Sequence, residues 1–156
     1  MGEIAAIVLA AGKGTRMKST LPKVMHRIAG RSMLGHVLDN LATLKPNRVV
    51  VLVGPDMDSV AQESAPHPTV IQREQLGTGH AVAAAKPALG TIGGTVLVLF
   101  GDAPFVGAET MKRLAQRREG SDQPAVVVLG VRPEDPGGYG RLVTDARGNL
   151  ERIVEQ

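Results

Sequence analysis

The chain of 156 residues contains no cysteine and no tryptophan, and only one tyrosine and two phenylalanines. Without cysteine, neither a disulfide framework nor a thiolate metal site is possible. So few aromatic rings leave no stacking platform for single-stranded nucleic acid. No apolar run approaches the roughly 20 residues that cross a bilayer, and the start of the sequence lacks the features of a secretory signal peptide. We therefore expect no nucleic-acid partner, no membrane partner and a cytoplasmic location.

Length and composition favour a single globular domain over residues 1–156. Hydrophobic residues make up 43% of the chain and charged residues 21%, which is typical of a soluble domain. The net charge of +3 is unevenly placed, because the first 31 residues hold six cations and a single acid, Glu3. The cations are Lys13, Arg16, Lys18, Lys23, Arg27 and Arg31. Such a local excess of positive charge suits a polyphosphate ligand.

Apolar runs alternate with stretches of helical periodicity, which indicates a parallel α/β sheet. The expected strands are 4–10, 48–54, 69–72, 95–100 and 125–131, and the expected helices are 32–44, 56–64, 79–89 and 108–119. Ser32 is the expected N-cap of its helix. Because most of these strands are continuously apolar, we expect helices on both faces of a doubly wound, mostly parallel sheet. Glycine- and proline-rich sequence after Pro133 leads into an expected hairpin at 141–155.

The most informative segment is Leu9–Met17 (LAAGKGTRM), which follows the first apolar run and precedes Pro22 and Lys23. Glycine lets a backbone come close to a ligand because it has no Cβ. Loop N–H groups and nearby cations can share the charge of a polyphosphate. The segment is no Walker A loop, and Met17 occupies the third glycine position of a dinucleotide fingerprint. It therefore predicts a nucleotide site of another kind.

Five segments resemble, in order and in spacing, the motifs of the sugar-nucleotide pyrophosphorylases, a family of NTP transferases. They are the glycine loop with its Pro22-Lys23, then 72–81 (QREQLGTGHA), 100–104 (FGDAP), 135–141 (DPGGYGR) and 153–155 (IVE). Within the family, the chain is most similar to the N-acetylglucosamine-1-phosphate uridyltransferases. The resemblance implies a Rossmann-like nucleotidyltransferase fold, shortened at its C-terminal end.

The resemblance further implies Mg²⁺-dependent transfer of a uridylyl group from UTP to N-acetylglucosamine 1-phosphate. The products are pyrophosphate and UDP-N-acetylglucosamine, a precursor of the cell wall. An in-line displacement needs positioning and charge neutralisation, so Arg16 and Lys23 are the expected catalytic residues. Asp102, at the end of an apolar strand, is the expected Mg²⁺ ligand.

The residues expected to bind substrate follow from the same motifs. They are Leu9, Ala10, Ala11, Gly12, Lys23, Gln72, Gly77, Thr78, Phe100, Gly101, Asp102, Gly140 and Glu155. The resemblance implies that Gln72 and the pair Gly77-Thr78 recognise the uracil edge. It also implies that Gly140 and Glu155 contact the sugar.

Purely structural roles for these residues, and other functions for the chain, stay open at this point. Arg16 and Lys23 could be solvated surface cations, and Asp102 could be a turn or cap residue. A molybdenum-cofactor-type guanylyl- or cytidylyltransferase shares the fold and the first loop, although the segment QLGTGH favours the uridyltransferase. A non-catalytic nucleotide-binding module is the third reading, because the family's further metal- and sugar-binding segment is not found. Apolar edges left uncovered could drive formation of a homo-oligomer.

Overall fold

The computed structural model describes residues 2–12, 14–74 and 76–155, and the chain divides into two compact units, residues 1–125 and 126–156. Two residues of the motifs, Lys13 and Gln75, lie outside the described residues. The expectation of a single domain over 1–156 stays a prediction.

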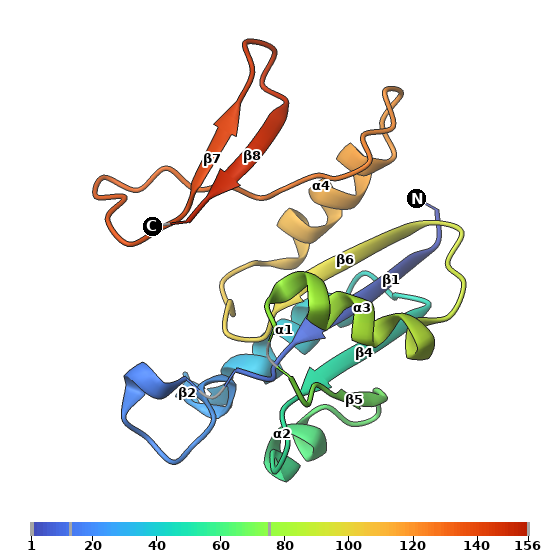
Figure 1. Ribbon diagram of the computed structural model, residues 1–156. Coiled ribbons are helices and arrows are strands. Elements are labelled where there is room, and N and C mark those ends of the chain that lie inside the picture. Colours follow the sequence, from blue (N-terminus) through green and yellow to red (C-terminus); the bar gives the residue numbers. More distant parts are fainter. Residues whose placement is uncertain (1, 13, 75, 156) are drawn as a thin grey trace. The chain divides into compact units, whose positions relative to one another are not determined.

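The first unit is built on a four-stranded parallel sheet with the strand order β5-β4-β1-β6 (Figure 1). The strands are β1 (Ile4–Leu9), β4 (Arg48–Val53), β5 (Thr69–Ile71) and β6 (Thr95–Phe100). From β1 the chain moves outward to β4 and β5, and then returns to the other side of β1 at β6. Open α/β sheets bind ligands where the strand order reverses, at the carboxyl ends of the strands. The predicted doubly wound α/β class is confirmed.

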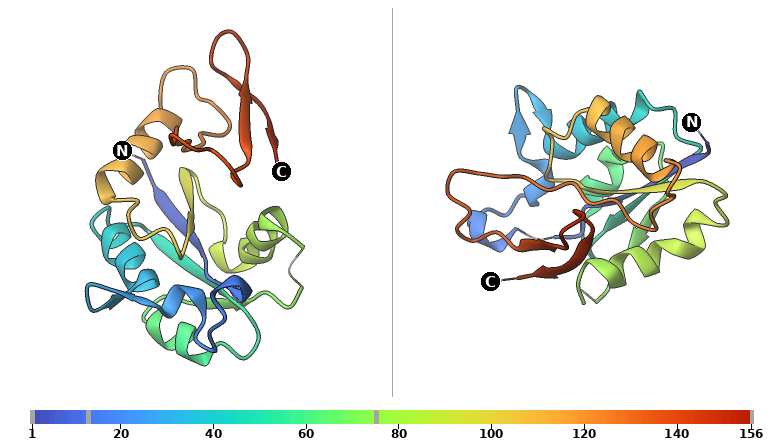
Figure 2. Two further views of the ribbon diagram at one scale, coloured as in Figure 1. Left: turned by 90° about the vertical axis from the view of Figure 1, so that its left-hand side faces the viewer. Right: turned by 90° about the horizontal axis from the view of Figure 1, so that it is seen from above.

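Helices cover both faces of this sheet, as expected (Figure 2). They are α1 (Met33–Ala42), α2 (Asp58–Glu63), α3 (Thr78–Leu89) and α4 (Ala108–Arg118). Helices α1, α2 and α4 contribute to the core on one face, and α3 contributes to the core on the other. In α3 the buried residues Ala81, Ala85 and Leu89 follow one another at intervals of four. The small side chains of Ala81 and Ala85 let this helix lie close to β1 and β4.

Helix α1 begins where the sequence predicts. The Ser32 hydroxyl accepts a hydrogen bond from the backbone N–H of Gly35 at 2.9 Å, which satisfies one of the free N–H groups of the first turn. The buried residues of the helix include Leu34, Val37, Leu38 and Leu41. This spacing places them on one face, turned toward the sheet.

Strand β6 departs from the expectation that both strand faces are covered. Its side chains alternate between buried and exposed, and Val96, Val98 and Phe100 are 38%, 41% and 53% exposed. The strand is at the edge of the sheet, and the core under α3 is built from residues of β1 and β4 without any from β6. A continuous apolar run therefore does not ensure that a helix lies over both of its faces.

The strand predicted at 125–131 is wrong, because these residues are irregular. Val126, Val128, Leu129 and Val131 are all exposed there. β-branched residues favour a strand only when a neighbouring strand pairs with them. No ladder among the described residues includes this run.

The second unit contains the predicted hairpin, formed by the antiparallel strands β7 (Arg141–Thr144) and β8 (Leu150–Val154). The Asp145 carboxylate accepts hydrogen bonds from the backbone N–H groups of Arg147 and Asn149. Gly148 has a φ of +81°, a conformation that glycine adopts without strain. None of the described residues from 126 onward is buried.

Short elements between β1 and α1 were not predicted. They are the 3₁₀ turns η1 (Thr15–Met17) and η2 (Lys23–Met25) and the small antiparallel pair β2 (Arg27–Ile28) and β3 (Arg31–Ser32).

Among all the helices in the described part of the chain, none is long and apolar enough to cross a membrane.

Candidate active site

A cleft of about 290 Å³ opens at the carboxyl edge of the sheet of the first unit. It is lined by Leu9, Ala11, Gly12, Gly14, Lys23, Val24, Gln72, Gly77, Thr78, Ala81, Phe100 and Asp102. These residues come from the ends of β1 and β6, from the loop after β1, from η2, from the residue after β5 and from the start of α3. The cleft therefore lies where the strand order reverses, which is the position that the fold favours for a ligand.

Most of the residues expected to bind substrate lie in this cleft. Ala10 is the exception at the end of β1, because it is buried in the core with 1% of its surface exposed. Arg16 is exposed on η1 and is not among the residues that line the cleft. Gly140 and Glu155 belong to the second unit. Within that unit the structure brings them together, since a Cβ on Gly140 would lie 3.2 Å from Glu155 Oε2.

The two glycines of the first loop differ in what surrounds them. A Cβ on Gly12 would meet no atom within 4 Å, so Gly12 leaves open space along the cleft. A Cβ on Gly14 would lie 2.5 Å from Cβ of Lys23, and Gly14 has a φ of +64°. Gly14 thus allows the loop to pass directly against Lys23. The two parts of the sequence motif, the glycine loop and the Pro22-Lys23 pair, are therefore in contact in the fold.

Gly101 has a comparable role at the end of β6. Its N–H donates to the Leu9 carbonyl at 2.9 Å, and a Cβ would lie 3.1 Å from that carbonyl oxygen and 3.2 Å from Cγ1 of Val24. Val24 is 4% exposed and belongs to the core, although its neighbour Lys23 faces the cleft. This close packing brings Asp102, the residue after Gly101, next to Lys23, the residue before Val24.

Lys23 and Asp102 form an ion pair across the cleft. Lys23 Nζ lies 2.6 Å from Asp102 Oδ2, and the two side chains are 42% and 31% exposed. The sequence singled out both residues, for phosphate and for metal, without indicating that they contact each other. Their contact joins the segment after the glycine loop to the end of β6.

The opposite wall of the cleft carries the residues expected to recognise a base. Gln72 follows β5, is 6% exposed, and donates its backbone N–H to the Val53 carbonyl at 2.8 Å. Gly77 has a φ of +97° and forms the N-cap of α3 without a side-chain hydrogen bond. A Cβ on Gly77 would meet nothing within 4 Å, so backbone groups at this corner are accessible to a ligand.

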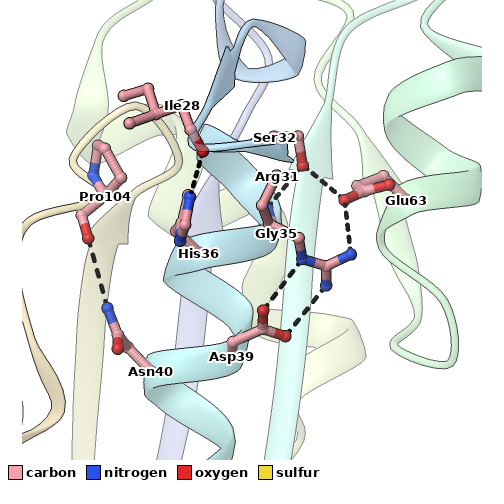
Figure 3. A network of polar contacts seen from close by, with 9 residues as sticks. All are labelled: Ile28, Arg31, Ser32, Gly35, His36, Asp39, Asn40, Glu63 and Pro104. Atoms are coloured by element: carbon pink, nitrogen blue, oxygen red, sulfur yellow. Dashed lines mark hydrogen bonds and ion pairs between the residues drawn. The ribbon is translucent and has the colours of Figure 1, made fainter.

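A polar network outside the cleft lining anchors the segment that follows Lys23 (Figure 3). The Arg31 guanidinium donates to both carboxylate oxygens of Asp39 at 3.0 Å, and its Nη1 lies 3.5 Å from Glu63 Oε1. The Ser32 hydroxyl donates to the same Glu63 oxygen at 2.5 Å. The hydrogen bond to Asp39 is the main cause that raises the pKa of Arg31 above its ordinary value. These contacts link β3, α1 and α2.

The same network explains Gly35, which stands where a capping box would place a glutamate. A Cβ on Gly35 would lie 2.6 Å from Nε of Arg31 and 2.7 Å from Oε1 of Glu63. The space is thus occupied by side chains from two other elements. No pattern in the sequence indicated this network, because its members come from separate segments of the chain.

Asp102 is the carboxylate of the cleft to which a cation could bind. Within the described residues, no group of three or more histidine, aspartate or glutamate side chains is placed to hold a metal ion. Mg²⁺ commonly uses one or two carboxylates and takes its other ligands from water and substrate phosphates. A single carboxylate that lines the cleft fits such an ion when it arrives together with a nucleotide.

Comparison with known proteins agrees with the fold. Residues 6–152 match the family described as MobA-like NTP transferase domain. The chain belongs to this family. It is a nucleotidyltransferase domain with a Rossmann-like fold.

Relatives in sequence carry the name Bifunctional protein GlmU. That of Paramagnetospirillum magneticum is 59% identical over 153 residues, which are 98% of this chain and 34% of the relative. That of Rhodospirillum rubrum is 55% identical over 155 residues, 99% of this chain and again 34% of the relative. The chain thus spans about a third of the length of these relatives.

Solved structures with this fold include HddC from Yersinia pseudotuberculosis complexed with GMP-PN, with a TM-score of 0.74 and 24% identity over all of this chain and 70% of that one. The inositol-1-phosphate CTP transferase from T. maritima has a TM-score of 0.75 and 19% identity, again over all of this chain and 65% of that one. At these identities the likeness concerns the fold.

Proposed function

We propose that this domain transfers a uridylyl group from UTP to N-acetylglucosamine 1-phosphate and releases pyrophosphate. The observation that carries the proposal is the cleft at the strand reversal, where Lys23, Asp102 and the open space at Gly12 come together. The GlmU relatives and the family match support nucleotidyl transfer of the GlmU type. The proposed reaction would take place in the cytoplasm and would supply an activated sugar for cell-wall precursors.

In the proposed step, a phosphate oxygen of the sugar 1-phosphate attacks the α-phosphorus of UTP. The bond between the α-phosphorus and the bridging oxygen breaks, and pyrophosphate leaves with that oxygen. Lys23, in the cleft, would neutralise charge on the phosphates, and Arg16, on η1, would contact the triphosphate. The reaction needs no covalent intermediate, so positioning and electrostatic stabilisation are what the residues must supply.

The opposite wall would hold the base. Uracil carries both a hydrogen-bond donor and acceptors, and the Gln72 amide offers both kinds of partner. Gln72 is nearly buried beside the cleft, where a hydrogen bond is exposed to little competition from water. Gly77 and Thr78 would complete this wall. Gly140 and Glu155 remain our candidates for contact with the sugar.

The proposal assigns Mg²⁺ to Asp102. A bound Mg²⁺ would offset negative charge on phosphate oxygens. The protein would contribute the Asp102 carboxylate, and the phosphates and water would supply the other ligands.

The test is pyrophosphate release from UTP and N-acetylglucosamine 1-phosphate with Mg²⁺, measured beside GTP and CTP as matched nucleotides. Binding of UDP-N-acetylglucosamine is measured by calorimetry on the same sample. Release with UTP and little with the other two supports the proposal. Release with GTP or CTP in place of UTP would replace it by a transferase of the molybdenum-cofactor type. Binding without release would indicate a nucleotide-binding module.

A further inference from the structure

The ion pair between Lys23 and Asp102 raises a question about the order in which ligands enter the cleft. Each of the two charges has the other as its partner, at 2.6 Å. If the proposed function holds, each must take a different partner during the reaction. Lys23 must face phosphate oxygens, and Asp102 must face a divalent cation.

The backbone around the two residues is closely packed. Lys23 is held on one side by the close approach of Gly14, and on the other by Val24, which is anchored in the core. Asp102 follows Gly101, whose N–H is bonded to the end of β1. The fold therefore places the two residues opposite each other, and their side chains remain partly exposed to water.

A divalent cation alone meets a carboxylate that already has a positive neighbour. It must either displace the Lys23 ammonium or bind beside it, and like charges at this distance repel. A nucleotide alone meets the opposite problem. Drawing Lys23 toward its phosphates leaves Asp102 without a partner, facing an anion. When both ligands enter together, each charge of the pair gains a new partner of opposite sign.

We infer that Lys23 is the resident counter-ion of Asp102, and that a divalent cation and a nucleoside triphosphate bind cooperatively by exchanging this pair. The inference rests on the proposed function. Each ligand then raises the affinity for the other by the same factor, since coupling between two sites is reciprocal. Because both side chains are partly exposed to water, the effect on the cation is moderate, roughly three- to tenfold.

The experiment measures binding of Mn²⁺ to the full chain without substrate, by the loss of the free Mn²⁺ signal in electron paramagnetic resonance. The variant is Lys23→Met, which keeps the length of the side chain and removes its charge. Lys18→Met is the matched control, because Lys18 is an exposed cation on the same segment. We expect Lys23→Met to bind Mn²⁺ roughly three- to tenfold more tightly than the parent chain, and Lys18→Met to bind it as the parent does.

A second titration adds UTP without the sugar phosphate, so that no turnover occurs. In the parent chain, UTP should tighten Mn²⁺ binding by more than the binding of Mn²⁺ to free UTP accounts for. In Lys23→Met this tightening should be smaller. Asp102→Asn should remove the Mn²⁺ site in both backgrounds, and Lys23→Arg, which keeps the charge, should behave as the parent.

Three results would overturn the inference. The first is equal or weaker Mn²⁺ binding by Lys23→Met. The second is an equal gain in Lys18→Met, which would indicate a general field effect in place of an exchanged pair. The third is Mn²⁺ binding that survives Asp102→Asn. Lys23→Gln repeats the test if Lys23→Met fails to fold, as judged by circular dichroism. A failure of the proposed function appears elsewhere, as the absence of pyrophosphate release by the parent chain.

Discussion

The two units of the chain are stabilised in different ways. Residues 1–125 enclose cores on both faces of a parallel sheet, built from side chains of separate strands and helices. Residues 126–156 contain a hairpin and have no buried residue in their described part. The first unit thus depends on contacts between distant parts of the sequence, and the second on backbone pairing and the chemistry of one turn. The cleft lies in the unit with the distant contacts.

The largest difference should appear when one large apolar side chain is removed from each unit. Ile7 is 2% exposed in the core under α3, and Ile153 is 53% exposed on β8. Ile7→Ala should lower the free energy of unfolding by about 2–5 kcal/mol, and Ile153→Ala by less than about 0.5 kcal/mol. Urea denaturation followed by circular dichroism measures both. Equal losses would mean that the hairpin depends on packing as the sheet does.

The next effect concerns the two glycines of the first loop. Gly14→Ala should destabilise the chain by about 1–2 kcal/mol because of its left-handed backbone, and should displace Lys23, whose Cβ lies 2.5 Å from the added atom. Gly12→Ala should leave stability unchanged, since open space surrounds the added atom. It should still weaken nucleotide binding by about tenfold, or about 1.4 kcal/mol. Thermal melting and calorimetry separate the two results, and tight binding by Gly12→Ala would place the ligand elsewhere.

A smaller effect is expected in the polar network of Arg31 and Glu63. Glu63→Gln removes the charge that Arg31 and the Ser32 hydroxyl share. We expect a loss of about 1 kcal/mol, because the contacts are few and partly exposed. Asp39→Asn is the matched control, since Asp39 pairs with the same guanidinium at a more exposed position. If both variants lose the same amount in urea denaturation, the Ser32 contact adds nothing.

The smallest effect lies in the hairpin. The hydrogen bonds from Asn149, first that of its side chain and then that of its backbone, hold the pKa of Asp145 below its ordinary value of 3.8. A lowered pKa in the folded state stabilises the turn above pH 3.8 and loses this effect as the pH falls through the lowered pKa. NMR signals of the Gly148 and Asn149 amides should shift in that acidic range. An unchanged hairpin at the lowest pH would show that the carboxylate is not needed.

Local features of the fold could be predicted from the sequence. The Ser32 cap, the alanine-rich α3 and the hairpin around Gly148 each depend on neighbouring residues. The run at 125–131 was predicted wrongly, because its side chains carry the composition of a strand but the pairing depends on another segment. The exposed face of β6 could not be predicted either, because its burial depends on a helix from another segment of the chain.

The candidate site shows the same limit. The resemblance to a known family identified the loops that line the cleft, and the sheet topology places these loops at one edge of the sheet. The resemblance did not indicate that Gly14 makes room for Lys23, or that Lys23 lies against Asp102. Spacing within a motif reports the residue types that a site needs. The contacts between motifs follow from packing over long distances in the sequence.

The most direct test of this account compares pyrophosphate release from UTP and N-acetylglucosamine 1-phosphate by the parent chain, Lys23→Met and Asp102→Asn. The account predicts release by the parent and a loss of roughly 100-fold or more in each variant, with unchanged circular dichroism. Release at the parent rate by both variants would contradict it, because the chemistry would then take place without the two charges that meet in the cleft.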